Sequence, residues 1–217
     1  MAQPSASPAG DDPSADPRVR DSKSARTRRR IVDAAAHVLV HRGYAGTRLS
    51  DVAEVAEVQA PAIYYYFASR DELIEEAVAV GLARARTLVE ESLAEAPADA
   101  SALDRLGVAV AAHLSTLLTH SDHAAAAIRT VPQLPDSMRA RHRQAERDYI
   151  DIWRGLITDA RAAGEVDTGL DAGVSLMVVL GALNWTAEWW DPSRGSLDGV
   201  ITTAQRLVAD GLLRRAP

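Results

Sequence analysis

The sequence predicts an all-α protein of about nine helices, in which an N-terminal domain of three short helices precedes a larger helical domain. Apolar residues recur at the spacing of an amphipathic helix through most of the chain. No run of alternating β-branched residues bounded by turn residues is present, so we expect no sheet. Proline, glycine and Ser-Asp breaks divide the helical pattern into separate elements.

The composition is that of an ordinary globular protein, with 217 residues, 47% hydrophobic and 25% charged. No stretch approaches the roughly 20 apolar residues that a membrane span requires, and the N-terminus has no apolar signal core. Cysteine is absent, which excludes disulfides, thiolate metal sites and cysteine nucleophiles. We therefore expect a cytoplasmic protein with no membrane partner.

Three segments are expected along the chain. Residues 1–22 are rich in Pro, Ser, Ala and Asp and nearly free of large apolar groups, so they are interpreted as a disordered tail. Residues 23–70 form the three-helix domain, and residues 71–217 form the helical body.

The helices of the N-terminal domain follow from local signals. The first is expected from Lys23 to Gly43, where glycine stops the helical pattern. Thr47 is the expected N-cap of the second helix. Pro61 suits the first turn of a third helix, Ala60–Tyr66, because its missing N–H is not needed there.

The body begins with a long helix. Ser69 and Glu72 have the spacing of a capping box at its start, and Pro97 ends the region. Further helices are expected at about 101–120, 122–130, 136–163, 171–190 and 196–214.

The net charge of −6 hides an asymmetry between these segments. Residues 1–17 carry −3, residues 18–70 carry +5, and residues 71–217 carry −8. A basic segment joined to an acidic body is expected when only one part of a protein meets a polyanion.

Three short helices with a tight turn between the second and third describe a helix-turn-helix unit. A recognition helix in the major groove needs small or polar residues at its N-terminal end, and Gln59, Ala60 and Ala62 meet that need. Gln59 can bond adenine, and the alanine methyls can meet the thymine methyl. Residues 64–66 are three tyrosines that point in successive directions, so at least one faces the core while the others can reach phosphates.

The segment from Gly43 to Leu73 resembles the DNA-binding domain of TetR-type transcriptional regulators. The likeness rests on the glycine closing the first helix, the threonine opening the second, its central Val-Ala pair, and the aliphatic–Tyr–x–Tyr–Phe run before a basic residue. It implies a homodimeric regulator, typically a repressor, that binds a palindromic operator in double-stranded DNA and is released by a small-molecule inducer. Arg28, from the basic cluster of the first helix, is also expected to contact DNA. The expected DNA contacts are Arg28, Thr47, Arg48, Ser50, Gln59, Ala60, Ala62, Tyr64, Tyr65, Tyr66 and Arg70.

Two residues depart from the family pattern. Glu57 stands where glycine is usual in the turn, which predicts either a strained backbone there or a differently shaped turn. Gln59 replaces the usual serine or threonine N-cap. The competing interpretations are that the tyrosines are plain core and that the arginines at 26–30 form a solvated face.

The body carries a weaker resemblance to the TetR regulators of fatty-acid and sterol catabolism, several of which sense acyl-CoA thioesters. It rests on short segments around residues 131–135, 141–153 and 180–186. The resemblance implies an apolar ligand tunnel, arginines at 141, 143 or 147 for an anionic head group, and a dimer through the last two helices. The expected lining residues are Leu117, Ile128, Trp153, Leu156, Met177 and Leu180, for which ordinary core packing is the alternative.

The remaining chemistry-bearing residues point to no enzyme. His113, His120 and His123 lie at helical spacing that three imidazole ligands of zinc could use, but no carboxylate completes a site, so we expect no metal or cofactor. No nucleophile–base pair, paired carboxylate motif or phosphate loop is visible. The competing function is a helical DNA-binding or interaction module without a small-molecule ligand.

Overall fold

The protein is described by a computed structural model that covers residues 17–120 and 122–212. The described residues form nine α-helices and no strand, which confirms the predicted all-α class. A π-helical turn, η1, and two 3₁₀ turns, η2 and η3, lie between them. The elements are α1 (Pro17–Gly46), α2 (Leu49–Val55), α3 (Ala60–Tyr66), α4 (Arg70–Glu95), α5 (Ala102–Ser115), η1 (Thr116–His120), α6 (Asp122–Thr130), η2 (Val131–Gln133), α7 (Asp136–Ala162), α8 (Ala172–Trp189), η3 (Pro192–Arg194) and α9 (Leu197–Leu212).

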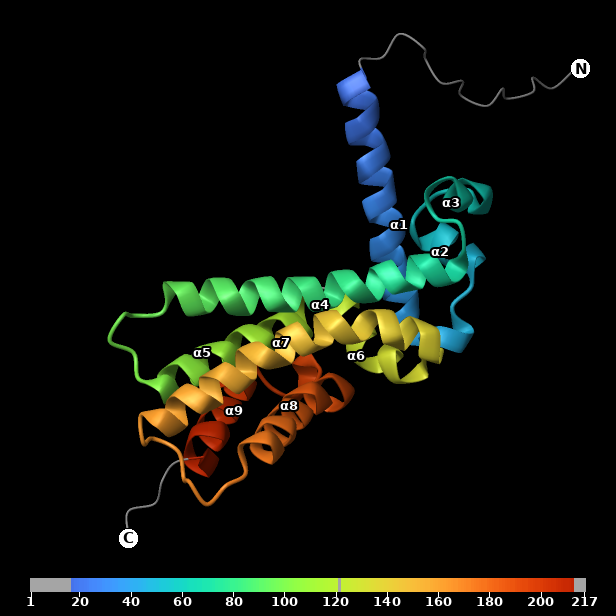
Figure 1. Ribbon diagram of the computed structural model, residues 1–217. Coiled ribbons are helices and arrows are strands. Elements are labelled where there is room, and N and C mark those ends of the chain that lie inside the picture. The colour runs from blue at the N-terminus through green and yellow to red at the C-terminus, as the bar shows by residue number, and fades with distance from the viewer. Residues whose placement is uncertain (1–16, 121, 213–217) are drawn as a thin grey trace, which may run out of the picture.

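Helix α4 connects the two parts of the molecule (Figure 1). Its first turns lie against α1, α2 and α3, and its remaining length runs across the body formed by α5, α7, α8 and α9. Helix α6 lies at the junction, where it contacts both α1 and α4. None of the described helices is long and apolar enough to cross a membrane.

The start of the first helix differs from the sequence prediction. Helix α1 begins at Pro17, so residues 17–22 belong to a helix and their assignment to the tail is wrong. The rest of the predicted tail, residues 1–16, lies outside the described residues. A proline is well suited to the first turn of a helix, and this signal competed with the composition of the segment.

The predicted cap of α2 is also wrong. Arg48 is the residue that precedes α2, and no side chain caps it. The Thr47 hydroxyl instead donates to the Gly43 carbonyl at 2.8 Å, and Thr47 is buried. Gly43 has φ +65°, the left-handed conformation that glycine tolerates, and this bend returns Thr47 to the end of α1.

The predicted start of α4 is confirmed. The Ser69 hydroxyl accepts from the Glu72 N–H at 3.1 Å, and the Glu72 carboxylate accepts from the Ala68 N–H at 2.7 Å. Pro61 lies in the first turn of α3, as expected.

Two hydrophobic cores meet along α4. The first joins α1, α2, α3 and the start of α4, and it includes Ala126, Ala127, Leu134 and Met138 from the body. The second joins the rest of α4 with α5, α7 and α8. The first core therefore continues past residue 70, so any movement of α6 disturbs the packing of the N-terminal helices.

Candidate nucleic-acid interface and ligand cavity

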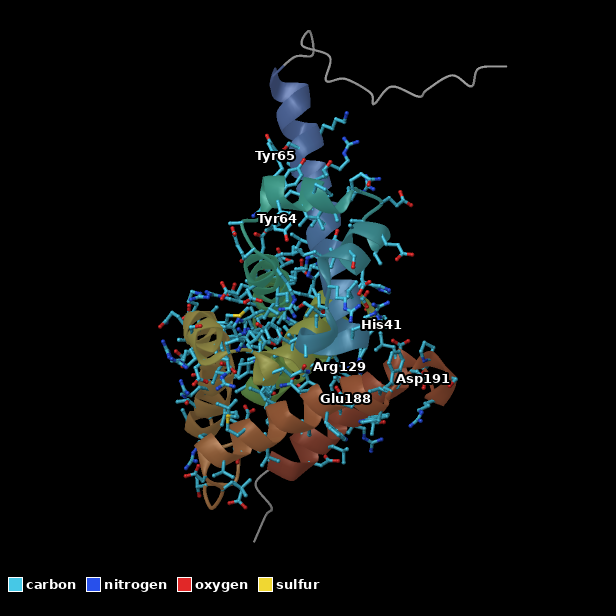
Figure 2. All side chains as sticks on the ribbon, turned by 90° about the vertical axis from the view of Figure 1, so that its right-hand side faces the viewer. His41, Tyr64, Tyr65, Arg129, Glu188 and Asp191 are labelled. Carbon is cyan, nitrogen blue, oxygen red and sulfur yellow. The ribbon has the colours of Figure 1, made fainter. Side chains whose placement is uncertain are left out.

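Helix α3 presents two of its three tyrosines to solvent. Tyr64 is 61% exposed and Tyr65 is 81% exposed, and both project away from the body (Figure 2). Tyr66 packs against the first core, and Ile63 is buried in it. The Tyr65 ring lies edge-on to the Tyr66 ring, but most of the surface of Tyr64 and Tyr65 is exposed and so available to a partner.

The other predicted DNA contacts near α3 lie on the same part of the molecule. Gln59, Arg48 and Ser50 are exposed, and Ala60 and Ala62 are half-buried. The exposed Arg48, Ser50 and Gln59 side chains carry N–H or O–H donors that can bond to the phosphates of a duplex.

Glu57 adopts the strained backbone that its position predicts, with φ +52°. Its carboxylate lies 3.6 Å from the Arg30 guanidinium, which also donates to the Ala56 carbonyl. Arg30 therefore caps the end of α2 and partly neutralises a carboxylate that would otherwise repel phosphate.

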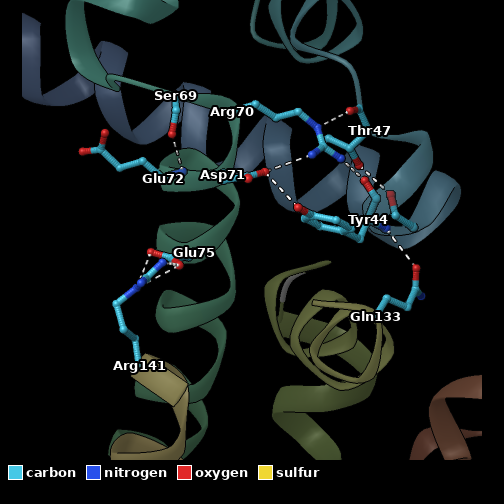
Figure 3. A network of polar contacts seen from close by, with 10 residues as sticks. Tyr44, Thr47, Ser69, Arg70, Asp71, Glu72, Glu75, Gln133 and Arg141 are labelled. Carbon is cyan, nitrogen blue, oxygen red and sulfur yellow. Dashed lines mark hydrogen bonds and ion pairs between the residues drawn. The ribbon is translucent and has the colours of Figure 1, made fainter. Parts of the chain in front are cut away.

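Two predicted DNA contacts have another role in the structure. Arg70 donates to the carbonyl of Thr47 at 2.7 Å and to the carbonyl of Tyr44, and its guanidinium stacks on the Tyr44 ring (Figure 3). It also pairs with Asp71 at 3.0 Å. Arg70 thus fixes the turn between α1 and α2, and Thr47 is buried beneath it.

The basic side chains of α1 extend the exposed surface. Arg28 pairs with Glu76 and stacks on the Phe67 ring, so it is partly held by the protein itself. Lys23, Arg26 and Arg29 are exposed. The arginine cluster signals this surface in the sequence, but only the structure separates Arg26 and Arg29 from Arg28 and Arg30, which pair with Glu76 and Glu57.

A cavity of about 310 Å³ lies in the body. Four of the six predicted lining residues line it: Leu117, Ile128, Met177 and Leu180. Trp153 and Leu156 do not, and their assignment is wrong. Trp153 is wholly buried in the second core with its ring edge-on to those of His113 and Tyr149, which do line the cavity.

The polar part of this cavity was not predicted from the sequence. The Tyr149 hydroxyl lies 2.7 Å from His113 Nδ1, and His113 Nε2 lies 3.1 Å from Asn184 Oδ1. Burial lowers the pKa of His113 to about 4 and raises that of Tyr149, so both are neutral near pH 7. The three residues come from α5, α7 and α8, and no local pattern links them.

The arginines expected to hold an anionic head group do not line the cavity. Arg141 donates to Glu75 at 3.0 Å, and Arg147 donates to Gln144. Their place on the outer face of α7 follows from the helical period, because His142, Glu146 and Tyr149 take the inner face.

A second polar contact ties α6 to the N-terminal helices. His123 Nδ1 lies 3.0 Å from the Ala77 carbonyl, and its Nε2 lies 2.7 Å from the Asp33 carboxylate. The Tyr44 N–H donates to the Gln133 side chain at 3.1 Å. We call these five residues the domain junction.

His113, His120 and His123 are therefore not one group. His113 and His123 face different partners, and the side chain of His120 lies outside the described residues. No cluster of three metal-ligating side chains occurs among the residues that the structure describes.

An exposed apolar stripe runs along α8 and α9. Val178, Trp185 and Leu207 are each more than 60% exposed. Grooves between the two helices are lined by side chains such as Leu183 and Val200. An exposed apolar surface of this kind is typical of a protein interface.

These features define a class of protein. A helix-turn-helix domain with an exposed recognition helix, joined through α4 and α6 to a helical body with a cavity, is the architecture of a DNA-binding transcriptional regulator.

The family is shown by comparison with known domains. Residues 31–77 match the model of bacterial regulatory proteins of the tetR family, and residues 99–211 match the Tetracyclin repressor-like C-terminal domain. The chain belongs to the TetR family of transcriptional regulators.

Individual relatives add detail. The chain is 25% identical to a fatty acid metabolism regulator protein of Bacillus subtilis, over 74% of this chain and 81% of the relative. It also resembles the crystal structure of the Bacillus subtilis regulator FadR in complex with stearoyl-CoA, with a TM-score of 0.68, 22% identity, and coverage of 85% of this chain and 98% of that one. The structure of AibR with isovaleryl coenzyme A and operator DNA matches with a TM-score of 0.75, 18% identity, and coverage of 83% and 97%.

Proposed function

We propose that this protein is a transcriptional repressor that binds a palindromic operator as a homodimer and is released from it by an acyl-CoA-type ligand. It acts in the cytoplasm, where its DNA target lies, and it catalyses no reaction. One observation carries this proposal: the helix that forms a wall of the cavity is the same helix that holds the DNA-binding domain.

That helix is α6, continued by η2. Ala124, Ala127 and Ile128 line the cavity, as do Val131 and Pro132 of η2. From the same segment, His123 bonds to α1 and α4, and Gln133 bonds to the end of α1. A ligand that displaces α6 therefore also shifts the support of the recognition helix.

Helix α6 is packed so closely against its neighbours that it cannot move without them. A Cβ at Gly81 of α4 would lie 2.2 Å from the His123 carbonyl oxygen, so the backbones of the two helices are in direct contact. On its other side, Arg129 of α6 donates to Glu188 of α8 at 2.8 Å, and Figure 2 shows this pair side by side. A displaced α6 moves its neighbours because densely packed helices transmit strain.

The DNA interface is assigned to α2, α3 and the basic start of α1. Gln59, Ala60 and Ala62 face the bases, and Tyr64 and Tyr65 reach the phosphates. Arg48, Ser50 and Arg28 contact the backbone of the duplex. Tyr66 anchors the recognition helix to the first core, and Arg70 holds the turn before α2 through the Thr47 carbonyl.

The homodimer is assigned to the exposed stripe on α8 and α9. Burying Trp185 and Leu207 against a second copy removes apolar surface from water, at roughly 25 cal/mol per Å². A symmetric dimer presents two recognition helices to half-sites roughly 34–36 Å apart.

The ligand class is supported by the cavity and by the relatives. The cavity is largely apolar and has a small number of polar groups, as is typical of small-molecule sites. The Bacillus subtilis relative was solved with stearoyl-CoA and AibR with isovaleryl coenzyme A. The ligand shifts the equilibrium because it binds the DNA-incompetent conformation more tightly.

An electrophoretic mobility shift with the DNA upstream of this chain's own gene tests the proposal. We expect binding that weakens steeply with salt, because phosphate contacts release counterions. Addition of an acyl-CoA series should release the DNA. Absence of DNA binding at low salt would refute the proposal. DNA binding that no acyl-CoA reverses would favour the alternative, a helical DNA-binding module without a small-molecule ligand.

A further inference from the structure

The cavity contains a buried polar cluster within a largely apolar wall. His113 and Tyr149 are both more than nine-tenths buried, and with Asn184 they form a continuous chain of hydrogen bonds. Leu117, Ile128 and other apolar residues form most of the remaining wall. In such a site the polar cluster determines where the polar atoms of a ligand lie.

The direction of the hydrogen bonds follows from the chemistry of the three groups. The Asn184 Oδ1 can only accept, so His113 Nε2 carries the proton and donates to it. The neutral imidazole then accepts at Nδ1, so the Tyr149 hydroxyl donates there. These bonds use the donors of Tyr149 and His113. The two N–H groups of Asn184 have no partner within the described part of the chain, and they are the donors that this cluster leaves for a ligand.

The charges of the wall select against an anion. Among the described lining residues there is no lysine or arginine, and Glu146 provides a carboxylate. His142 also lines the cavity, and burial lowers its pKa, so it does not supply a cation near neutral pH. A free carboxylate in the cavity would therefore face Glu146 without a compensating charge.

The volume sets the length of the ligand. A cavity of about 150 Å³ in another protein holds benzene, which has six heavy atoms. By this comparison a cavity of about 310 Å³ accepts roughly a dozen heavy atoms. An octanoyl thioester group, counted with its oxygen and sulfur, fits this volume, whereas a stearoyl group needs about twice as much.

We infer that the cavity binds a medium-chain acyl group as a neutral thioester whose carbonyl oxygen accepts a hydrogen bond from the Asn184 carboxamide. This inference rests on the proposed function, because it specifies which acyl-CoA the regulator senses. The apolar chain fills the space beside Leu117 and Ile128, and the charged part of coenzyme A stays outside the cavity. Asn184 is a specificity-determining residue, and His113 and Tyr149 hold its carboxamide in place.

Calorimetric titration of the full chain with four probes tests the inference: octanoyl-CoA, stearoyl-CoA, free octanoate, and the octyl thioether of coenzyme A, which lacks the carbonyl. We expect octanoyl-CoA to bind about tenfold more tightly than the thioether, the effect of one hydrogen bond to the Asn184 carboxamide. Stearoyl-CoA should bind at least tenfold more weakly than octanoyl-CoA, and octanoate more weakly still.

The variant Asn184→Leu removes the donor at similar volume. In this variant octanoyl-CoA and the thioether should bind equally, which a merely structural role of Asn184 would not produce. Met177→Leu, at another lining position, is the matched control and should keep the tenfold preference. If Asn184→Leu does not fold, the affinities of the unmodified chain for octanoyl-CoA and for the thioether still test the role of Asn184.

The outcomes separate this inference from the proposed function. Equal binding of thioester and thioether to the unmodified chain overturns the role of Asn184. Tighter binding of stearoyl-CoA or of octanoate overturns the length or the charge argument, while an acyl-CoA-responsive regulator would still stand. Binding of no acyl-CoA at all overturns both.

Discussion

The domain junction and the cavity each contain a buried histidine, ten positions apart in sequence, in different surroundings. At the junction, His123 has the Asp33 carboxylate as a partner, and Arg84 lies 3.5 Å from the same carboxylate. In the cavity, His113 has only the neutral groups of Tyr149 and Asn184. Hydrogen bonds to charged groups are about twice as strong as neutral ones. The polar contacts of the junction are therefore expected to be stronger than those of the cavity cluster.

The largest expected effect on stability is at the closest backbone contact of the domain junction. Gly81→Ala would place a methyl group 2.2 Å from the His123 carbonyl oxygen and force α4 and α6 apart. We expect a loss of about 3 kcal/mol in the free energy of unfolding. Urea denaturation measures it. Gly155→Ala on α7, where nothing lies near the added Cβ, is the control and should be neutral or stabilising by up to about 1 kcal/mol. An equal effect of both substitutions would contradict the tight packing.

The cavity histidine makes stability depend on pH. Burial lowers the pKa of His113 from 6.5 to about 4, so between these values the unfolded chain binds more protons than the folded one. The stability present above pH 6.5 is therefore lost as the pH falls toward 4, by about 2 kcal/mol between pH 6.5 and 5. Urea denaturation across this range should show a smaller loss in His113→Leu. Parallel curves for the two proteins would show that His113 is not the group responsible.

Replacing each histidine in turn tests the comparison directly. At pH 7, His123→Leu should cost about 2 kcal/mol of unfolding free energy, because the polar contacts with a carboxylate and with a buried carbonyl are both lost. His113→Leu should cost about 1 kcal/mol, since its partners are neutral. The same denaturation experiment ranks the two variants, and the reverse order would refute the distinction between junction and cavity.

The smallest effect is expected at the exposed tyrosines, which belong to neither region. Tyr65→Phe should weaken operator binding about fivefold, through loss of one phosphate hydrogen bond, without altering ligand affinity or stability. Tyr66→Phe is the comparison on the half-buried side of the same helix and should change affinity less. Fluorescence anisotropy with labelled operator measures both, and a larger effect at Tyr66 would place the DNA on another face of α3.

Much of the architecture could be predicted because its signals are local. Ser69 and Glu72 specify the start of α4 within four residues, and Pro61 specifies the start of α3. Of the two alternatives predicted at Glu57, the structure shows the strained backbone, since the requirement for a left-handed conformation belongs to the turn itself. The failures at Thr47 and at residues 17–22 concern helix ends, where a neighbouring bend or an earlier proline outweighs the local preference.

The all-α class, the helix-turn-helix unit and the basic segment that carries it could be predicted from the chain alone, since helical periodicity and capping depend on residues a few positions apart. The packing of the helices was needed to place Tyr64 and Tyr65 on the outside, Trp153 in the core, and Asn184 at the end of the polar cluster of the cavity. His113 and Asn184 are 71 positions apart, and His123 and Asp33 are 90. Contacts at such separations depend on how the helices pack, and no repeating pattern in the chain encodes them.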